Sequence, residues 1–347
     1  MSKKILRQFK LKKPYFIAEI GVNHEGSLKN AKRMIDAAKD GGASAVKFQT
    51  YKAEKLAIKN SPYYWDIKKE KTKSQFELFS KYDKFDLKHY KILSQYCSKK
   101  KIEFLSTPFD IDAVNFLNPL LRIFKISSSD ITNLPLLEAV ASKKKITILS
   151  TGASSLNEIR EAVKILSKKV NKIVLMHCIL NYPTEDSDAN LRMISSLQKE
   201  FPNCISGYSD HTLPKKNMQN LTTAYILGAK VIEKHFTINK KKKGNDHYHS
   251  LDKYDLKKFI KKINLVERTL GSNNKNFLKS ELKSRKNARR SIVLNKDLEK
   301  NHKIKKNDLT CKRPGVGLSP MFIKKVIGKK TKKKLLYDTI INWNLIK

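Results

Sequence analysis

The sequence is poor in cysteine and has no long apolar run. Its four cysteines are widely spaced and form no CxxC pair, which argues against a disulfide framework or a zinc ribbon. No apolar stretch approaches the length of a membrane span, and the basic N-terminus lacks the apolar core of a signal peptide. We therefore expect a cytoplasmic protein with no membrane association.

Arginine is scarce as well. The formal net charge is +41, but only ten of the 73 basic residues are arginines, and the 63 lysines are spread over nearly every polar segment. A nucleic-acid surface more often combines arginine clusters with aromatic side chains, because arginine adds stacking and bidentate contacts. We interpret the lysines as a compositional background and expect no nucleic-acid partner, although a positive field helps to gather a small anionic substrate.

A glycine-rich dinucleotide fingerprint is also missing after the first apolar run, which disfavours an open doubly wound sheet. Instead, short apolar runs alternate with segments of helical spacing, such as 155–168, 190–201 and 252–270. This alternation is typical of a parallel sheet covered by helices, and eight repeats predict a (β/α)8 TIM barrel. The eight predicted strands are 15–20, 43–48, 101–105, 121–126, 145–149, 173–176, 204–207 and 229–232.

The composition changes after Leu270, where apolar periodicity gives way to a polar, charged stretch. Before that point, the insertion at 60–85 contains Tyr63, Tyr64 and Trp65, and is either a lid or an ordered surface loop. The three predicted parts of the chain are the barrel domain at 1–270, a linker at 271–286 and a small second domain at 287–347.

Polar side chains follow the predicted strands at their carboxyl ends, where barrel enzymes build their active sites. Each residue alone is a weak signal, because a lysine near a strand end is usually solvated and an STG triplet is usually a turn or a cap. Together, Lys47, Lys125 and nearby hydroxyls form a cationic, donor-rich patch suited to phosphate or carboxylate. The residues expected at this common mouth are Glu19, Lys47, Gln49, Thr107, Lys125, Ser128, Asp130, Ser150, Tyr182, Asp210, His211 and His235.

Two histidines, His211 and His235, each come at the end of an apolar run. Imidazoles at two strand ends form a candidate metal pair, and the carboxylates of Asp210, Glu233 and Asp246 are near enough in sequence to orient them or to contact substrate. The alternative is that each is a hydrogen-bonded histidine without a metal.

The C-terminal domain contains one unusual turn, Arg313-Pro-Gly-Val-Gly. Two glycines and a proline would hold the arginine in a fixed position, which suits contact with an anion or an amide. The same residues are equally typical of a surface turn, and the sequence leaves both interpretations open.

These motifs match a known family in order along nearly the whole chain. They are IAEIGVNHEG, AVKFQT, FLSTPFD, KISSSD, ILSTGA, HCILNYPT, GYSDHT, IEKHF and KRPGVG. The chain resembles the sialic acid synthases, a group that includes legionaminic and pseudaminic acid synthases and spore-coat polysaccharide relatives. The resemblance implies a barrel followed by an antifreeze-like (SAF) domain. It also implies a domain-swapped homodimer in which each C-terminal domain reaches over the partner's active site.

The implied reaction condenses phosphoenolpyruvate with N-acetylmannosamine or a related N-acyl hexose and water. It yields a nonulosonic (sialic) acid and phosphate, with cleavage of the C–O bond of phosphoenolpyruvate. By motif position, His211 and His235 would bind a divalent metal, with Mn²⁺ as the first choice and Mg²⁺ or Co²⁺ as alternatives. Glu19 is the expected general base or acid, and Arg313 of the partner chain would contact the N-acyl group.

The resemblance also assigns the remaining substrate contacts. The residues expected to hold phosphoenolpyruvate are Lys47, Thr107, Lys125, Ser128, Ser150 and Ser209. The residues expected to face the sugar or the attacking water are Glu19, Gln49, Asp130, Tyr182 and Asp246. His247 and His249 are expected as substrate contacts and rank below His211 and His235 as metal ligands.

Two departures from the family pattern lie near the sugar. Leu180 stands where the sialic acid members carry asparagine, and Asp130 stands where they carry glutamate. These departures put the identity of the sugar in doubt, so a legionaminate or pseudaminate synthase acting on a 2,4-diacetamido-2,4,6-trideoxyhexose is the alternative. A metal-dependent aldolase explains the histidines but leaves the paired lysines without a role, and a nucleic-acid-binding protein rests on charge alone.

Overall fold

The structure, a computed structural model, describes residues 13–244 and 246–347. Within these ranges the eight predicted runs form eight strands of one sheet, and every hydrogen-bonded pair is parallel. The strand order is β3-β2-β1-β8-β7-β6-β5-β4, and the end strands β3 and β4 pack side by side, so the sheet closes. The strands are β1 (Tyr15–Gly21), β2 (Ala45–Thr50), β3 (Glu103–Pro108), β4 (Ile123–Ile126), β5 (Ile146–Ser150), β6 (Ile173–Cys178), β7 (Ile205–Asp210) and β8 (Val231–His235).

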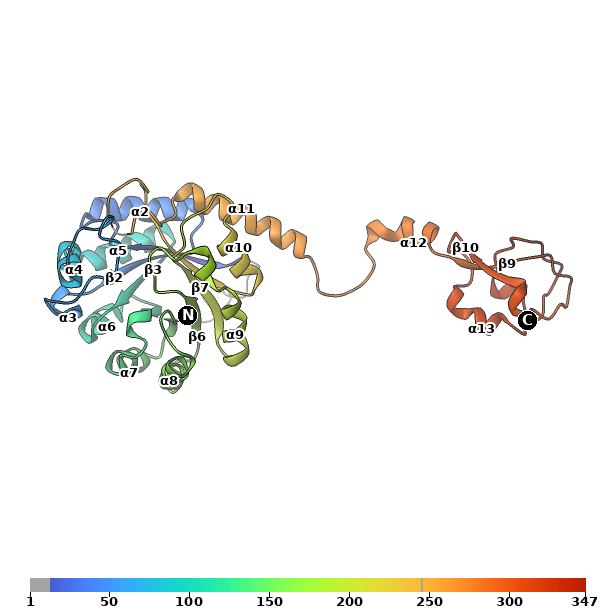
Figure 1. Cartoon of the computed structure of the whole chain (residues 1–347), viewed down its shortest axis with the longest axis horizontal. Helices are drawn as coiled ribbons and strands as arrows, with labels where there is room; N and C mark the ends of the chain where they lie inside the picture. The colour runs from blue at the N-terminus through green and yellow to red at the C-terminus, as the bar shows by residue number, and fades with distance from the viewer. Residues whose placement is uncertain (1–12, 245) are drawn as a thin grey trace. The chain divides into compact units, whose positions relative to one another are not determined.

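Helices follow the strands and surround the barrel (Figure 1), which confirms the predicted (β/α)8 architecture. Ser27 caps the first of them, because its Oγ accepts a hydrogen bond from the backbone N–H of Asn30 at 3.2 Å. The helices of this unit are α2 (Leu28–Gly41), α3 (Ala53–Leu56), α4 (Gln75–Tyr82), α5 (Leu87–Lys100), α6 (Ile111–Leu117), α7 (Leu134–Ser142), α8 (Leu156–Ser167), α9 (Arg192–Glu200), α10 (Gln219–Ile226) and α11 (Lys253–Leu270), with 3₁₀ turns η1 (Ser128–Asp130) and η2 (Asp186–Ala189).

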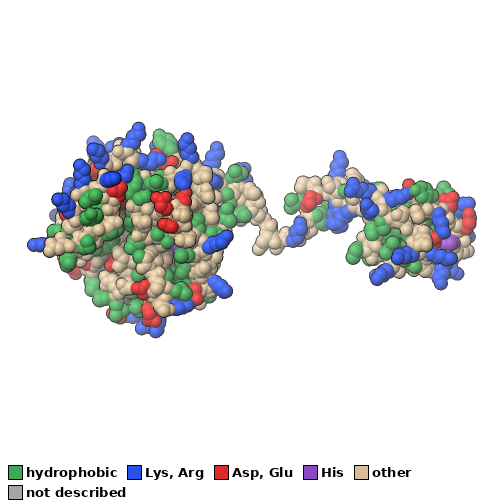
Figure 2. Space-filling view, viewed as in Figure 1, with side chains coloured by type: hydrophobic (Ala, Val, Ile, Leu, Met, Phe, Trp, Pro, Cys, Tyr) green, Lys and Arg blue, Asp and Glu red, His purple; other side chains and the backbone are tan. Residues whose placement is uncertain are grey.

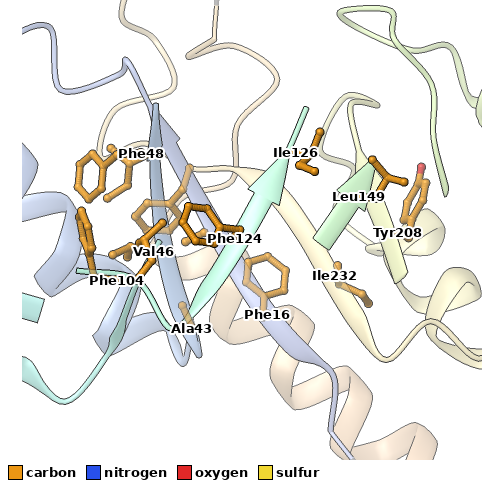
Figure 3. Packing of buried hydrophobic residues seen from close by; sticks show 14 of the residues in the cluster. Phe16, Ala43, Val46, Phe48, Phe104, Phe124, Ile126, Leu149, Tyr208 and Ile232 are labelled. Atoms are coloured by element: carbon orange, nitrogen blue, oxygen red, sulfur yellow. The ribbon is translucent and has the colours of Figure 1, made fainter. Parts of the chain in front are cut away.

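The outward-facing side chains of the strands form the larger core. Phe16, Phe48 and Phe124 belong to a buried cluster between the sheet and the helices (Figure 3). Because successive strand residues point to opposite faces, the residues between them point into the barrel. A second cluster, which includes Ile17, Ile148 and Val231, fills that interior.

The polar mouth lies one layer above this apolar interior. Two residues beyond each interior residue, a polar side chain faces inward on the same strand: Ile17 precedes Glu19, and Val231 precedes Glu233. The period of two therefore converts eight separate strand ends into one ring of polar groups. The members of this ring are Glu19, Lys47, Thr107, Lys125, Ser150, Cys178, Ser209 and Glu233.

The chain divides into two compact units, Met1–Leu270 and Gly271–Lys347. The second has its own core, with Ile292 and Leu294 at its centre. Its first residues, the predicted linker at 271–286, contain helical structure, because the run from Leu282 is rich in the helix formers leucine, lysine and arginine. The elements of this unit are η3 (Lys279–Glu281), α12 (Leu282–Ala288), β9 (Ser291–Leu294), η4 (Lys306–Asp308), β10 (Leu309–Lys312), η5 (Pro320–Phe322), α13 (Ile323–Val326) and η6 (Trp343–Leu345), with β9 and β10 antiparallel.

The surface of the molecule carries the excess of basic residues. Lysine and arginine side chains are scattered over the visible faces of both units (Figure 2). Among the residues that the structure describes, no helix is both long and apolar enough to cross a bilayer. Residues 1–12, which hold most of the basic N-terminal segment, lie outside the described residues.

Candidate active site

The ring of polar groups is held together by two buried lysines. Lys47 on β2 contacts Glu19 Oε2 on β1 at 2.7 Å and donates to Thr107 Oγ1 on β3 at 2.9 Å. Because these contacts join three adjacent strands, the ammonium group has a fixed position inside the barrel mouth. Gln49, two residues further along β2, donates to the other oxygen of Glu19 at 3.2 Å.

The second lysine, Lys125, lies on β4, which is separated from β2 by β3 alone. It donates to Ser150 Oγ on β5 at 2.7 Å and lies 3.5 Å from Glu233 Oε1 on β8. Ser209 on β7 donates to the same Glu233 oxygen at 3.2 Å. Glu233 also lies 3.9 Å from Lys47, so one carboxylate links both cations.

Burial changes the acidity of these groups. It raises the pKa of the Glu19 carboxyl to about 7, against the opposing effect of Lys47. Burial also opposes ionisation of Glu233, but Lys125 and Lys47 outweigh it and hold the pKa of this carboxyl below its ordinary value. The ring therefore contains one carboxylate that stays ionised and one carboxyl that titrates near neutrality.

A cavity of about 400 Å³ opens above this ring. Both lysines and several hydroxyls reach its wall, together with two histidines, so donors outnumber acceptors. Such a wall suits an oxyanion, because ammonium groups and hydroxyls donate to phosphate or carboxylate oxygens. The lining residues are Glu19, Lys47, Gln49, Thr107, Phe109, Lys125, Ser127, Ser128, Ser150, Cys178, Leu180, Tyr182, Ser209, His211, Glu233 and His235.

A second cavity, of about 560 Å³, shares Gln49, Tyr182 and His235 with the first. Its other walls are mainly aromatic, and the predicted insertion at 60–85 supplies several of them. The insertion is therefore part of a cavity wall in this structure. The lining residues are Val22, Gln49, Tyr51, Tyr64, Leu78, Phe79, Tyr82, Tyr182, His235 and Asp246.

The two predicted metal ligands lie together at the junction of the cavities. The rings of His211 and His235 have centroids 5.6 Å apart. His211 Nδ1 lies 2.7 Å from the carbonyl oxygen of Ile179, and because a carbonyl only accepts, Nδ1 carries the proton. This leaves the Nε2 lone pair of His211 available to a metal, which is the usual arrangement for a ligating histidine.

The loop after β8 brings more candidate ligands to the same place. Leu251 N–H donates to the carbonyl of His235 at 2.8 Å, so the chain folds back over the end of β8. Within the described residues, His235, Asp246 and His249 form one group whose ligand atoms all lie within 4.8 Å of one another. Burial raises the pKa of the Asp246 carboxyl to about 7 and lowers that of the His211 imidazole to about 4. Two neutral imidazoles and a carboxylate are a donor set that fits a divalent transition metal.

Two predicted residues of the barrel unit do not line either cavity. Asp210 points away from the mouth and pairs with Lys234 at 2.7 Å, so the prediction that it shares the mouth is wrong. The physical reason is strand alternation, since Asp210 falls between the inward-facing Ser209 and His211. Asp130 accepts a hydrogen bond from Asn133 Nδ2 at 3.2 Å and stands outside the residues that line the two cavities.

Arg313 belongs to the second unit and is exposed. Its turn is held by Ser291, whose Oγ donates to the carbonyl of Pro314 at 2.6 Å and accepts from Gly317 N–H at 2.8 Å. The turn is thus fixed as expected, and the contact that its arginine makes with a ligand stays a prediction.

Several lining residues were missed by the sequence analysis. Glu233 was noted as a neighbour of His235, but its place in the ring was not predicted, although the spacing of two residues on one strand is a usable signal. The aromatic wall, formed by Tyr51, Tyr64, Phe79 and Tyr82, carried no motif.

Comparison with known proteins agrees with this geometry. The NeuB family model matches residues 34–275 and the SAF domain model matches residues 289–347. Over 338 residues the chain is 40% identical to the N,N'-diacetyllegionaminic acid synthase of Campylobacter jejuni, a match that covers 95% of this chain and 99% of that protein. It is 35% identical over 284 residues to the N-acetylneuraminate-9-phosphate synthase of Mus musculus, a match that covers 80% of this chain and 77% of that protein.

Among solved structures, the N-acetylneuraminic acid synthetase of Leptospira borgpetersenii is similar, with a TM-score of 0.70 and 36% identity over 78% of this chain and 90% of that one. These matches confirm the resemblance expected from the motifs. The chain belongs to the NeuB family and carries a SAF domain at its C-terminal end.

Proposed function

We propose that this protein is a nonulosonic (sialic) acid synthase that condenses phosphoenolpyruvate with an N-acyl hexose and water. The observation that carries the proposal is the pair of joined cavities, one cationic and one aromatic, which meet at Gln49, Tyr182 and His235. Two substrates of different chemistry would meet at that junction. The family membership supports the same reaction class.

Phosphoenolpyruvate fits the cationic cavity. Its phosphate and carboxylate need several donors, and the cavity offers Lys47, Lys125 and the hydroxyls of Thr107, Ser150 and Ser209. Glu233 keeps the two lysines at fixed separation through its contacts of 3.9 and 3.5 Å. An anion entering the cavity would take over donor contacts that these lysines otherwise make with carboxylates.

The acceptor fits the aromatic cavity, with its aldehyde at the junction. Carbon C3 of phosphoenolpyruvate would add to the aldehyde carbon, water would add to C2, and phosphate would leave with the bridging oxygen. A divalent ion bound by the histidines would supply Lewis-acid polarisation of the aldehyde oxygen. Glu19, whose pKa lies near 7, would accept the proton of the attacking water, and the lysines would stabilise the departing phosphate.

A 2,4-diacetamido-2,4,6-trideoxyhexose is the second candidate for the acceptor, beside N-acetylmannosamine. Two of the similar proteins, from Campylobacter jejuni and Legionella pneumophila, bear the name N,N'-diacetyllegionaminic acid synthase. An acceptor with two acetamido methyls and a deoxy carbon has more apolar surface to place against Tyr64, Leu78 and Phe79. Leu180, where the family pattern has asparagine, adds an apolar side chain to the wall of the adjoining cationic cavity.

The proposal includes Mn²⁺ as the ion, with Mg²⁺ or Co²⁺ as alternatives, and a cytoplasmic location. It also includes a domain-swapped homodimer in which Arg313 of one copy contacts the N-acyl group in the partner's site. The exposure of Arg313 and the fixed geometry of its turn support this role.

The test is phosphate release from phosphoenolpyruvate labelled with ¹⁸O at the bridging oxygen. Chelator-treated protein is supplied with Mn²⁺ and offered either acceptor in parallel. We expect acceptor-dependent release of phosphate that contains the label, because the C–O bond breaks. His211→Ala should abolish release, whereas substitution of His89, a half-buried histidine in the first turn of α5, by alanine should not. No release with either acceptor, or unlabelled phosphate, would contradict the proposal.

A further inference from the structure

His249 is the most unusual side chain outside the expected metal pair. It is completely buried, and neither of its ring nitrogens has a hydrogen-bond partner in the described part of the chain. Among the same described residues, His235 Nδ1 is also buried and has no hydrogen-bond partner. Buried polar groups are nearly always paired, because an unpaired one keeps the full cost of its desolvation. Three such nitrogens in one place point to a ligand.

The fold aims these groups at each other. The rings of His235 and His249 have centroids 4.8 Å apart, and His235 Nδ1 lies 3.5 Å from Asp246 Oδ2. The loop is held in this position because Asn23 Nδ2 donates both to the carbonyl of Phe236 at 3.1 Å and to Ser250 Oγ at 3.2 Å. The cluster is therefore part of a fixed framework at the end of β8.

The neighbouring histidine of the same loop behaves differently. His247 Nδ1 lies 2.8 Å from Thr237 Oγ1, and His247 Nε2 lies 3.4 Å from Glu25 Oε1. Both of its nitrogens have protein partners, so it has no free donor atom for an ion. His247 and His249 are both buried in one loop, but in the described part of the chain only His249 has ring nitrogens without a hydrogen-bond partner, as a metal ligand requires.

We propose that His249 is a metal ligand, and that a divalent ion binds to His235, Asp246 and His249. The strand-end pair His211 and His235 would then be supplemented by a third imidazole from the loop. Three imidazoles and one carboxylate still leave coordination positions for water or a substrate oxygen. An imidazole-rich set also favours Mn²⁺, Co²⁺ or Zn²⁺ over Mg²⁺, which prefers oxygen ligands.

The inference rests on the proposed function only for the role of the ion. Ion binding is measured in the absence of phosphoenolpyruvate and acceptor. A protein that binds the ion but releases no phosphate would therefore disprove the synthase and support the metal site. A protein that releases phosphate but does not bind the ion through His249 would support the synthase and disprove the metal site.

The first experiment measures Mn²⁺ binding to the full-length, chelator-treated protein by electron paramagnetic resonance of the free ion and by calorimetry. We expect His249→Ala to weaken binding by at least about tenfold, as loss of a ligand should exceed the effect of losing a supporting contact. His247→Ala is the matched control and should weaken Mn²⁺ binding clearly less than His249→Ala, because both ring nitrogens of His247 are engaged by Thr237 and Glu25. Circular dichroism and thermal melting check that each variant is folded.

A His249→Gln variant covers the case in which His249→Ala does not fold. A dissociation constant within twofold of the wild type in the folded His249 variant would overturn the proposal, and would indicate that ordered water satisfies the ring. Equal weakening by the His249 and His247 variants would also overturn it, since that pattern indicates a general loop effect.

A second readout is the visible spectrum of the Co²⁺-loaded protein, which reports the ligands of the ion directly. We expect the d–d bands to change in position and intensity in the His249 variant and to stay unchanged in His247→Ala. The wild type should also bind Co²⁺ more tightly than Mg²⁺, and this preference should shrink in the variant. An unchanged Co²⁺ spectrum in the His249 variant would count against ligation.

Discussion

The two cavities of the barrel mouth are built in different ways. The cationic cavity is lined mainly by residues on or next to strand ends, and its charged groups contact each other across adjacent strands, as Lys47 does with Glu19 and Thr107. The aromatic cavity is lined largely by connecting segments, with Tyr64 and Tyr82 from the insertion and Asp246 from the loop after β8. They meet at Gln49, Tyr182 and His235.

We infer from this difference that the strand-built cavity serves the chemistry and the loop-built cavity selects the acceptor. Strand ends in a closed sheet have little freedom, so groups that hold a phosphate or move a proton are best placed there. Connecting segments vary without disturbing the barrel, so a wall made from them suits the choice of acceptor. We therefore expect strand substitutions to reduce the rate with every acceptor, and loop substitutions to change acceptor affinity selectively.

The largest expected effect is on the proton-transfer group of the strand-built cavity. Glu19→Gln keeps the size of the side chain but removes the base, and should lower kcat/KM by about 10³-fold. Since burial raises the pKa of Glu19 to about 7, a base needed in its ionised form is lost below that pH. The wild-type kcat/KM should rise with pH up to about 7 and then level, and steady-state rates over pH 5–9 check this.

The pH profile needs a control, because burial also raises the pKa of Asp246 to about 7. An Asp246→Asn variant that keeps the inflection would assign it to Glu19. If the wild-type kcat/KM instead falls above pH 7, and Glu19→Gln lacks this fall, the carboxyl acts as an acid in the wild type. An unchanged profile in Glu19→Gln would remove this residue from the chemistry.

Next in size is the loss of one cation from the same cavity. Lys125→Met removes a donor that lies 2.7 Å from Ser150 Oγ, and should lower kcat/KM for phosphoenolpyruvate by about 10²-fold, the usual cost of one charge-stabilising donor. The same loss is expected with both acceptors. Lys88→Met, an exposed lysine of α5, is the control for the general reduction of positive charge. An effect on one acceptor alone would contradict the proposal that strand residues serve the chemistry and loop residues select the acceptor.

The strand-built half was largely predictable from the sequence. Apolar runs end in polar residues at a regular interval, and the eightfold alternation with helices predicts closure, so Lys47, Lys125 and His235 could be placed at one mouth. The error at Asp210 came from treating a run of neighbouring polar residues as equivalent. Because side chains alternate along a strand, Ser209 and His211 face the mouth, whereas Asp210 faces the other way and pairs with Lys234.

The loop-built half was not predictable, for physical reasons. Residues far apart in the chain, such as Tyr51 and Tyr182, meet only because the barrel closes, and no local period marks them. The burial of His249 is likewise a product of the loop's return over β8. The tyrosines of the insertion were visible in the sequence, but which of them faces the cavity depends on the tertiary fold.

Two neighbouring tyrosines of the insertion allow a matched test of the aromatic cavity. Tyr64 lines it and its neighbour Tyr63 does not, while both are largely exposed, at 59% and 46%, so neither substitution should disturb the core. Tyr64→Ala should raise KM for the acceptor by about tenfold, the value of one aromatic contact, with KM for phosphoenolpyruvate unchanged. Tyr63→Ala should change neither constant. Equal effects of the two variants would show that the insertion acts as a whole.

The smallest expected effect concerns Cys178, the thiol in the wall of the cationic cavity. Burial raises its pKa to about 11, so at pH 7.5 the thiol is neutral and contributes neither charge nor a nucleophile. Cys178→Ser should therefore change kcat/KM by less than about threefold, because a hydroxyl replaces a neutral thiol. Iodoacetamide at pH 7.5 should label the partly exposed Cys311 before Cys178, as mass spectrometry can measure. Rapid labelling of Cys178 with loss of activity would reveal a thiolate, and the charge of this cavity would then not be set by its lysines and carboxylates alone.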